Sequence, residues 1–291
     1  MKKVIATIFV IFTALACGSA VHAFGISPVK QYLTITPGTG QLIYVEVSNS
    51  DSVAKKFDVG ILGVKQNDKG IPIFGEHLDE AENWVIPEAR NVEILPNSTK
   101  KIEFAVSVPF GTQSGGHYVG LVVREGSADW SDVGISGELA SIVTIQVAGE
   151  TRENVSVEMW KTSGWIKIGR QWNFFAKLQN NGNIDTALMG EVRVRSWGEN
   201  IVYSSAVNLG NRLLANTGRS VEIPILVSDD ATMWPGLYRV EIKVQYGRLG
   251  QTISSVQNLI YLPIWPSLLC VVVFFIIIAL FVLLKNKLSG K

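Results

Sequence analysis

The chain has 291 residues, more than one small module needs, so its length favours two domains. Apolar residues make up 47% and charged residues 18%, and the mean hydropathy is +0.25, which excludes a disordered chain. The 26 basic and 25 acidic residues nearly balance, and basic residues gather at both ends, so the middle is slightly acidic. An acidic middle lacks the basic face that nucleic acid requires, so we exclude nucleic acid as a partner.

Residues 1–23 have the pattern of a secretory signal peptide. Two lysines precede a short apolar run, and small residues lead to a cleavage site after Ala23. The alternative is a lipobox that ends at Cys17, which would then be lipidated and become the new N-terminus. Either form of processing predicts export of the chain.

Short runs of alternating apolar and polar residues fill the chain from residue 24 to residue 262. This alternation predicts strands that are buried on one face, and residues 41–47, 101–108 and 238–244 are examples. Pro-Gly and Asn-rich turn signals separate the runs. We predict an all-β fold of two tandem Ig-like β-sandwich domains, 24–149 and 150–262.

An internal repeat supports two similar units. One strand ends at Asn49 in the first unit and at Asn180 in the second. An Asn-led turn follows at Asn97 and again at Asn216, 119 positions later. A Gly-x-Tyr strand then follows in both units. The shared order of these signals predicts the same sandwich twice.

Residues 263–284 predict a single C-terminal transmembrane helix, because about 20 uncharged apolar residues cross a hydrocarbon core of about 30 Å. The positive-inside bias places the basic tail, 285–291, in the cytoplasm. We therefore expect a single-pass protein of the cell membrane with an extracellular N-terminal ectodomain. Four side chains suit the membrane interfaces: Tyr261, Trp265, Lys285 and Lys287.

No pattern in the sequence indicates catalysis. Residues 113–117 (Gln-Ser-Gly-Gly-His) resemble the surroundings of a serine nucleophile, but the matching place in the second unit has neither Ser nor His, so we interpret both as turns. The acidic run 76–82 lacks the spacing of a cation loop and is interpreted as a solvated loop. Cys17 and Cys270 lie in the apolar end segments, so no disulfide is expected. We predict no catalytic residue, no metal site and no cofactor.

Five of the eight tryptophans fall in the second unit, more than one sandwich core usually holds. Core packing accounts for some of them, but exposed aromatic residues stack on sugars or bury a partner's side chains. Trp234 and Pro235 lie in a predicted loop. The candidate binding residues are therefore Trp234, Pro235 and Trp197.

Several short landmarks are similar to those of the WxL-interacting proteins, a family of bacterial surface proteins. They are Ile26-Ser27-Pro28, Thr36-Pro37-Gly38, Val47-Ser48-Asn49, Leu95-Pro96-Asn97-Ser98, Leu178-Gln179-Asn180, Leu214-Ala215-Asn216 and Pro235-Gly236-Leu237-Tyr238. The order of signal peptide, two Ig-like domains, membrane helix and basic tail also resembles that family. The resemblance implies a wall-binding first domain, a second domain that binds host or matrix proteins, and association with WxL-type surface proteins. Residues 251–256 depart from the family's aromatic-rich closing strand.

The sequence thus predicts a non-enzymatic, membrane-anchored bacterial surface protein, with Ig-like domains that bind cell-wall glycan (peptidoglycan) or a surface or host protein in adhesion. The alternative is a chaperone-like assembly factor for secreted surface subunits, because Ig sandwiches related to pilus chaperones donate an edge strand to incomplete subunits. The predicted membrane helix counts against the alternative.

Overall fold

The computed structural model describes residues 24–126, 137–210, 212–228 and 233–289, except for several side chains in the last helix. The predicted signal peptide, its cleavage site and Cys17 lie outside the described residues. The side chains of Trp265, Cys270, Lys285 and Lys287 lie outside them as well.

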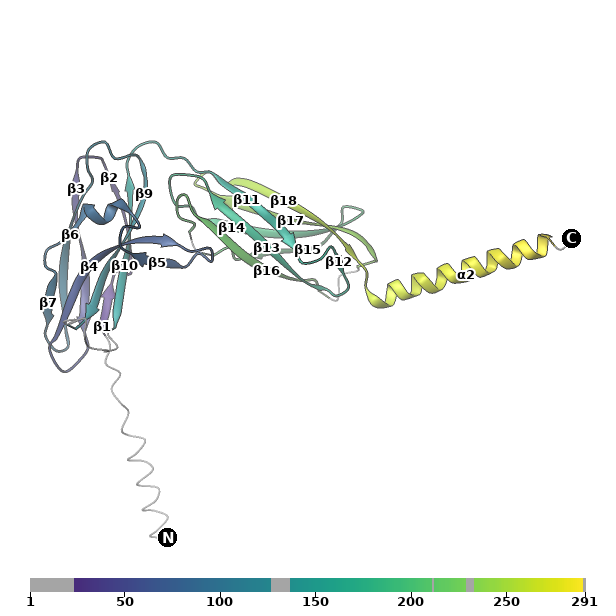
Figure 1. Cartoon of the computed structure of the whole chain (residues 1–291), viewed down its shortest axis with the longest axis horizontal. Coiled ribbons are helices and arrows are strands. Elements are labelled where there is room, and N and C mark those ends of the chain that lie inside the picture. The colour runs from purple at the N-terminus through teal and green to yellow at the C-terminus, as the bar shows by residue number, and fades with distance from the viewer. Residues whose placement is uncertain (1–23, 127–136, 211, 229–232, 290–291) are drawn as a thin grey trace, which may run out of the picture.

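The first ten strands form an N-terminal sandwich of two sheets around one core (Figure 1). The first sheet has the order β1 (Phe24–Ser27), β3 (Gly40–Asn49), β8 (Ser98–Ser107) and β6 (Val85–Pro87). The second has the order β2 (Lys30–Ile35), β10 (Glu138–Val147), β9 (Gly115–Glu125), β4 (Lys55–Gln66) and β5 (Pro72–Gly75), and β7 (Asn91–Ile94) also pairs with β4. A short 3-10 helix, η1 (Glu80–Trp84), precedes β6.

The next eight strands form a C-terminal sandwich around a separate core (Figure 1). Its first sheet has the order β11 (Val155–Thr162), β13 (Gln171–Asn180) and β16 (Gly218–Leu226). Its second has the order β12 (Ile166–Lys167), β18 (Gln251–Tyr261), β17 (Gly236–Tyr246), β14 (Leu188–Ser196) and β15 (Ile201–Val207). The predicted all-β, Ig-like sandwich fold is therefore confirmed, while the domain boundary near residue 149 stays a prediction.

Alternating side chains account for both cores, since successive residues of a strand point to opposite faces of the sheet. In β3, Ile43, Val45 and Val47 are buried while the residues between them are exposed. In β13, Trp172 and Phe174 are buried in the same way. Burying such apolar faces contributes most of the stability of each sandwich.

The two sandwiches repeat one buried turn. The Asn49 side-chain amide donates to the carbonyls of Val53, Ile94 and Leu95 at 2.8, 3.1 and 3.2 Å, and its oxygen accepts from Asp51 N at 3.0 Å. Asn49 is 1% exposed, and Asn180, its counterpart in the second sandwich, is fully buried.

The Asn180 amide makes the same set of bonds in the second sandwich. It donates to the carbonyls of Ile184, Leu213 and Leu214 at 2.9, 3.1 and 3.1 Å and accepts from Gly182 N at 2.9 Å. The Asn-led turns match as well, because Asn97 and Asn216 both have positive φ, 49° and 54°. The sequence repeat thus reflects a repeated hydrogen-bond pattern.

The last strand of each sandwich is partly covered by a short parallel strand. Six residues of β10 pair with β2, and two residues of β18 pair with β12. In both sandwiches the opening strand changes sheets, so β1 pairs with β3 before the chain continues into β2, and β11 pairs with β13 before β12. Among the residues that the structure describes, open backbone edges therefore remain on β2 and on most of β18.

Helix α2 (Ile264–Ser289) follows β18 and extends away from the C-terminal sandwich (Figure 1). Over the described residues, no helix has the length and apolar character that a membrane crossing requires. This finding contradicts the predicted transmembrane helix 263–284 and the predicted single-pass localisation in the cell membrane.

The structure also differs from the expected position of Tyr261. The sequence places this residue at a membrane interface, but only 3% of its surface is exposed. Its ring lies 5.8 Å from that of Tyr238, edge to face, and 6.0 Å from that of Trp172, so it belongs to the C-terminal core. Successive side chains of β18 point to opposite faces of the sheet, and that of Tyr261 points to the core. An aromatic residue beside an apolar stretch of sequence does not by itself show this packing.

Candidate binding site at the junction of the two sandwiches

The two sandwiches meet at a polar junction in which side chains of one bind backbone groups of the other. The Gln66 amide at the end of β4 donates to Arg212 O at 2.9 Å, and its oxygen accepts from Leu214 N at 3.2 Å. One side chain thus satisfies two backbone groups of the 212–214 segment, as a neighbouring strand would. The Tyr118 hydroxyl accepts from Ala215 N at 3.1 Å and extends this contact.

Asn183 fixes the opposite side of the junction. Its amide donates to Ser114 O and to Glu150 O, both at 2.9 Å, and its oxygen accepts from Arg152 N at 2.6 Å. Its backbone carbonyl also accepts from Gly116 N at 2.8 Å. The Asn-rich loop 180–185, which is one of the turn signals in the sequence, therefore also connects the two sandwiches.

The β4–β5 hairpin reaches across to the edge of β16 (Figure 1). Ser220 N donates to Asp68 O at 2.6 Å, which pairs the hairpin tip with that edge. Gly70, with φ of 77°, lies against the guanidinium of Arg219, so that a Cβ on it would come within 2.2 Å of Nε. Arg219 is buried, and burial lowers the pKa of its guanidinium. This packing requires a residue without a side chain at position 70.

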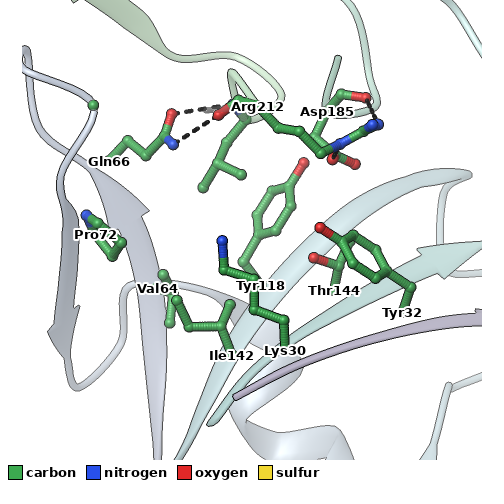
Figure 2. Close-up of a pocket in the computed structure, with 12 residues that line it drawn as sticks. Lys30, Tyr32, Val64, Gln66, Pro72, Tyr118, Ile142, Thr144, Asp185 and Arg212 are labelled. Carbon is green, nitrogen blue, oxygen red and sulfur yellow. Dashed lines mark hydrogen bonds and ion pairs between the residues drawn. The ribbon is translucent and has the colours of Figure 1, made fainter. Parts of the chain in front are cut away.

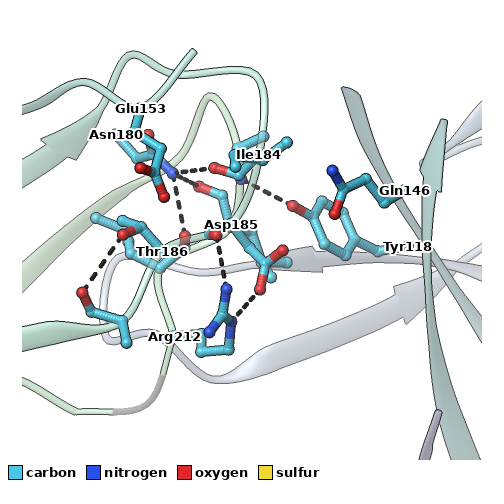
Figure 3. Close-up of polar contacts among 12 residues, drawn as sticks. Tyr118, Gln146, Glu153, Asn180, Ile184, Asp185, Thr186 and Arg212 are labelled. Carbon is cyan, nitrogen blue, oxygen red and sulfur yellow. Dashed lines mark hydrogen bonds and ion pairs between the residues drawn. The ribbon is translucent and has the colours of Figure 1, made fainter. Parts of the chain in front are cut away.

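An ion pair borders the same junction (Figure 3). The Arg212 Nε donates to a carboxylate oxygen of Asp185, and its Nη2 donates to the Asp185 carbonyl at 2.8 Å. Asp185 follows the Asn180 turn directly, so the turn places this carboxylate. Figure 3 shows the pair between that turn and Tyr118.

A pocket of about 150 Å³ opens beneath this ion pair (Figure 2). Its floor is the outer face of the sheet that contains β2, β10 and β9, and Figure 2 shows Tyr32, Tyr118 and Thr144 rising from it toward Arg212 and Asp185. These three residues share one row, because Tyr32 pairs with Thr144 and Thr144 with Tyr118. Further lining residues are Lys30, Val64, Gln66, Gly70, Pro72, Ile142 and Leu214.

The pocket lining combines apolar and charged groups. Val64, Ile142 and Leu214 supply an apolar surface, whereas Lys30 and the Asp185–Arg212 pair supply charge at its rim. Burial raises the pKa of the Tyr118 hydroxyl far above its usual range. An apolar side chain with a polar backbone beside it suits this combination.

The acidic run 76–82, interpreted as a solvated loop, has a structural role instead. Asp79 caps η1 by accepting from Ala81 N at 3.0 Å, and Glu82 accepts from Asp79 N at 3.1 Å, which is a capping box. Asp79 also bonds His117 Nδ1 at 2.9 Å and Tyr118 N at 2.9 Å. The loop is thereby fixed to β9 beside the junction.

Residues 113–117 are a turn and strand start, as interpreted from the repeat. The Ser114 hydroxyl donates to Glu150 O at 2.9 Å, while His117 bonds Asp79 and lies 4.5 Å, ring centroid to ring centroid, from Trp84. The two side chains have different partners. No cluster of three or more potential metal ligands occurs among the described residues.

The tryptophans divide between core and surface. Trp160 and Trp172 are buried, whereas Trp165, Trp197 and Trp234 are 63%, 78% and 69% exposed. Pro235, the third predicted binding residue, is half-buried. None of the predicted residues Trp234, Pro235 and Trp197 lines the junction pocket.

The sequence analysis missed the residues that build the junction. Gln66 ends an ordinary strand, and its partners lie 146 and 148 positions away, so no local signal marks it. Tyr118 was noted only as part of the repeat. One sequence signal could have indicated this surface: the alternation of β2 places Lys30, Tyr32 and Thr34 on the face of the sheet opposite the core.

Comparisons with known proteins give distant structural likenesses alone. No family model and no curated protein matches the chain. Among solved structures, a chain described under "Chaperone-tip adhesin complex is vital for synergistic activation of CFA/I fimbriae biogenesis" is 12% identical, with a TM-score of 0.45, over 83% of this chain and 99% of that one. The class 5 fimbriae chaperone CfaA is 11% identical, with a TM-score of 0.45, over 83% and 100%.

A third structure, of the Salmonella enterica SafA pilin in complex with the SafB chaperone, is 9% identical, with a TM-score of 0.40, over 84% of this chain and 98% of that one. These likenesses are too distant to place the chain in a family.

Proposed function

We propose that this protein binds an extended segment of a secreted or surface protein by strand addition to the outer edge of β2, as a chaperone-like assembly factor does. The observation that carries the proposal is that one strand provides both an open backbone edge and two lining residues of the junction pocket. Strand addition supplies affinity through backbone hydrogen bonds, and pockets for alternate side chains supply specificity.

The hydrogen-bond register shows which backbone groups of β2 are open. Ile142 N donates to Val29 O and Ala148 N donates to Ile35 O, so the odd-numbered residues of β2 bond β10. Backbone groups alternate in direction along a strand, so those of Lys30, Tyr32 and Thr34 point away from β10. Within the part of the chain that the structure describes, no strand pairs with this edge.

The side chains of the same residues face the junction. Lys30 and Tyr32 line the pocket, and Tyr32 is 61% exposed. Figure 2 shows the Lys30 side chain extending into the pocket beside Tyr118. A strand added to β2 would therefore run along the pocket rim. One of its apolar side chains would then pack against the exposed ring of Tyr32 at that rim.

The experiment introduces a photo-cross-linking amino acid at position 32 of the full chain in its native host. We expect an adduct with a secreted protein, and mass spectrometry of the adduct identifies the bound segment. Thr34→Pro removes one outward N–H without removing a bond to β10, which an edge strand tolerates. Thr34→Ala is the matched control, because it keeps that N–H.

The proposal predicts that the adduct persists in Thr34→Ala and is lost in Thr34→Pro, at an unchanged melting temperature. An adduct of equal yield in both variants would show that the backbone edge takes no part in binding. Absence of any adduct at position 32, with adducts at the exposed position 201 of β15, would place binding on another edge and overturn the proposal.

A further inference from the structure

A second pocket, of about 290 Å³, lies on the C-terminal sandwich at the end opposite the junction. The turn between β14 and β15 forms one wall, and the first residues of β17 form the floor. The lining residues that carry the argument are Trp197, Glu199, Leu237, Arg239 and Asn258. None of them touches the β2 edge, so this site is independent of the proposed function.

The turn holds Trp197 out into solvent. Ser196 N donates to Asn200 O at 2.9 Å and Glu199 N donates to Ser196 O at 2.9 Å, which closes the hairpin. The Trp197 side chain is 78% exposed although an indole is among the largest apolar groups. A tight turn that displays an indole at this exposure presents one flat apolar face to a ligand.

Glu199 occupies a backbone conformation that glycine adopts at lower cost. Its φ is 61°, in the left-handed region, where a glutamate is uncommon. Its carboxylate accepts from the Arg239 guanidinium, Nη1 to Oε1, at 3.0 Å. Strained residues of this kind gather at functional sites, and here the strained residue positions a charged pair beside the exposed indole.

The strand register completes the pocket. Leu237 pairs with Ile260 and is 40% exposed, and Arg239 pairs with Asn258 on the same face. An apolar row therefore lies beside a polar row. The Arg239–Glu199 pair carries no net charge and leaves free lone pairs and N–H groups next to the Asn258 amide.

We propose that this pocket binds a neutral hexopyranose unit of a glycan. The C–H face of the sugar ring packs on the Trp197 indole, and the sugar hydroxyls bond the polar row of Glu199, Arg239 and Asn258. A free anion is disfavoured because Glu199 already neutralises Arg239. An added peptide strand is disfavoured because the pocket lies mainly over the β14–β15 turn and β17, and β17 is paired on both edges.

The test titrates the purified full chain with two uncharged probes, chitotetraose and cellotetraose. Tryptophan fluorescence follows binding to the unsubstituted chain, and isothermal titration calorimetry measures the affinity of every variant, because Trp197→Ala removes the indole that reports binding. We expect a saturable blue shift with at least one probe. Trp197→Ala is expected to weaken binding at least about tenfold, and Trp197→Phe to retain part of it. Trp165→Ala is the matched control, because Trp165 is also exposed but does not line this pocket.

Loss of sugar binding can be distinguished from loss of the fold, because an exposed side chain can be replaced without unfolding the protein. The melting temperature of each variant verifies that it is folded. Binding that is lost in Trp197→Ala and kept in Trp165→Ala supports the site. No saturable shift with either probe, or equal affinities in Trp197→Ala and the unsubstituted chain, overturns it. Thr34→Pro is expected to leave sugar binding unchanged, so the two proposals can fail separately.

Discussion

The two sandwiches use equivalent tyrosines for different purposes. Tyr238 in the second sandwich donates its hydroxyl hydrogen to Trp234 O, four residues upstream at 2.9 Å, and so fixes its own loop. Tyr118, at the matching place in the first, accepts from Ala215 N of the other sandwich. Both rings are buried, 5% exposed for Tyr118 and 4% for Tyr238. The two sandwiches therefore share the position of this tyrosine, but the partner of its hydroxyl differs, and in the first sandwich that partner belongs to the contact between the sandwiches.

The open edges differ in the same way. In the first sandwich β2 covers six residues of β10 and presents its own outer edge beside the junction pocket. In the second, β12 covers two residues of β18, and most of β18 is open. Val256 is the large apolar residue most exposed along this strand, at 48%. The β18 edge is longer, but only the β2 edge adjoins the junction pocket.

The largest effect should come from the feature that the sandwiches share. Asn49→Ala and Asn180→Ala each leave three buried or part-buried carbonyls without the amide, so each should lower the free energy of unfolding by about 2–4 kcal/mol. Chemical denaturation measures both. Asn181→Ala is the control, since that side chain is exposed and bonds Ser156 Oγ, another exposed side chain atom. A cost below about 0.5 kcal/mol at either asparagine would contradict the equivalence of the two turns.

The hairpin that crosses the junction provides the next test. Gly70→Ala should cost about 1–3 kcal/mol, because the residue combines positive φ with contact to the buried Arg219 guanidinium. Gly111→Ala is a matched control with φ of 78° and open space around it. Thermal unfolding of both variants separates the backbone strain from the junction contact. Equal costs would mean that Arg219 moves aside freely.

The tyrosines themselves sharpen the comparison. Tyr118→Phe and Tyr238→Phe each remove one hydrogen bond and should cost about 1 kcal/mol. Small-angle scattering of each variant should show a changed arrangement of the two sandwiches only for Tyr118→Phe. A change of equal size in Tyr238→Phe would contradict the division of roles.

The smallest effect concerns pH. Burial raises the pKa of Tyr118, so the folded state retains the phenol proton at a pH where the unfolded chain, with an ordinary value of about 10, has lost it. The stability that depends on the neutral phenol is therefore fully present below about pH 10 and is lost as the pH rises above that value. Tyr118→Phe should make the fall in unfolding free energy above pH 10 shallower. An unchanged slope would contradict this.

Local sequence signals were sufficient for the scaffold. Alternation identified β3, β8 and β17, and the paired asparagines identified turns that use the same bonds. The junction could not be predicted in this way, because Gln66 and Asn183 bind groups far away in the sequence. In the acidic run 76–82 the capping box of Asp79 and Glu82 is local, but the contact of Asp79 with Tyr118 N on β9 spans 39 positions and has no local signal.

The most direct test of the account is amide hydrogen exchange of the full chain, with and without a synthetic peptide of the segment cross-linked at position 32. The account predicts new protection at the outward amides of Lys30, Tyr32 and Thr34, with no change at Thr252 and Ser254 on the open β18 edge. Protection that appears on β18 alone, or peptide binding without protection of β2, would contradict it.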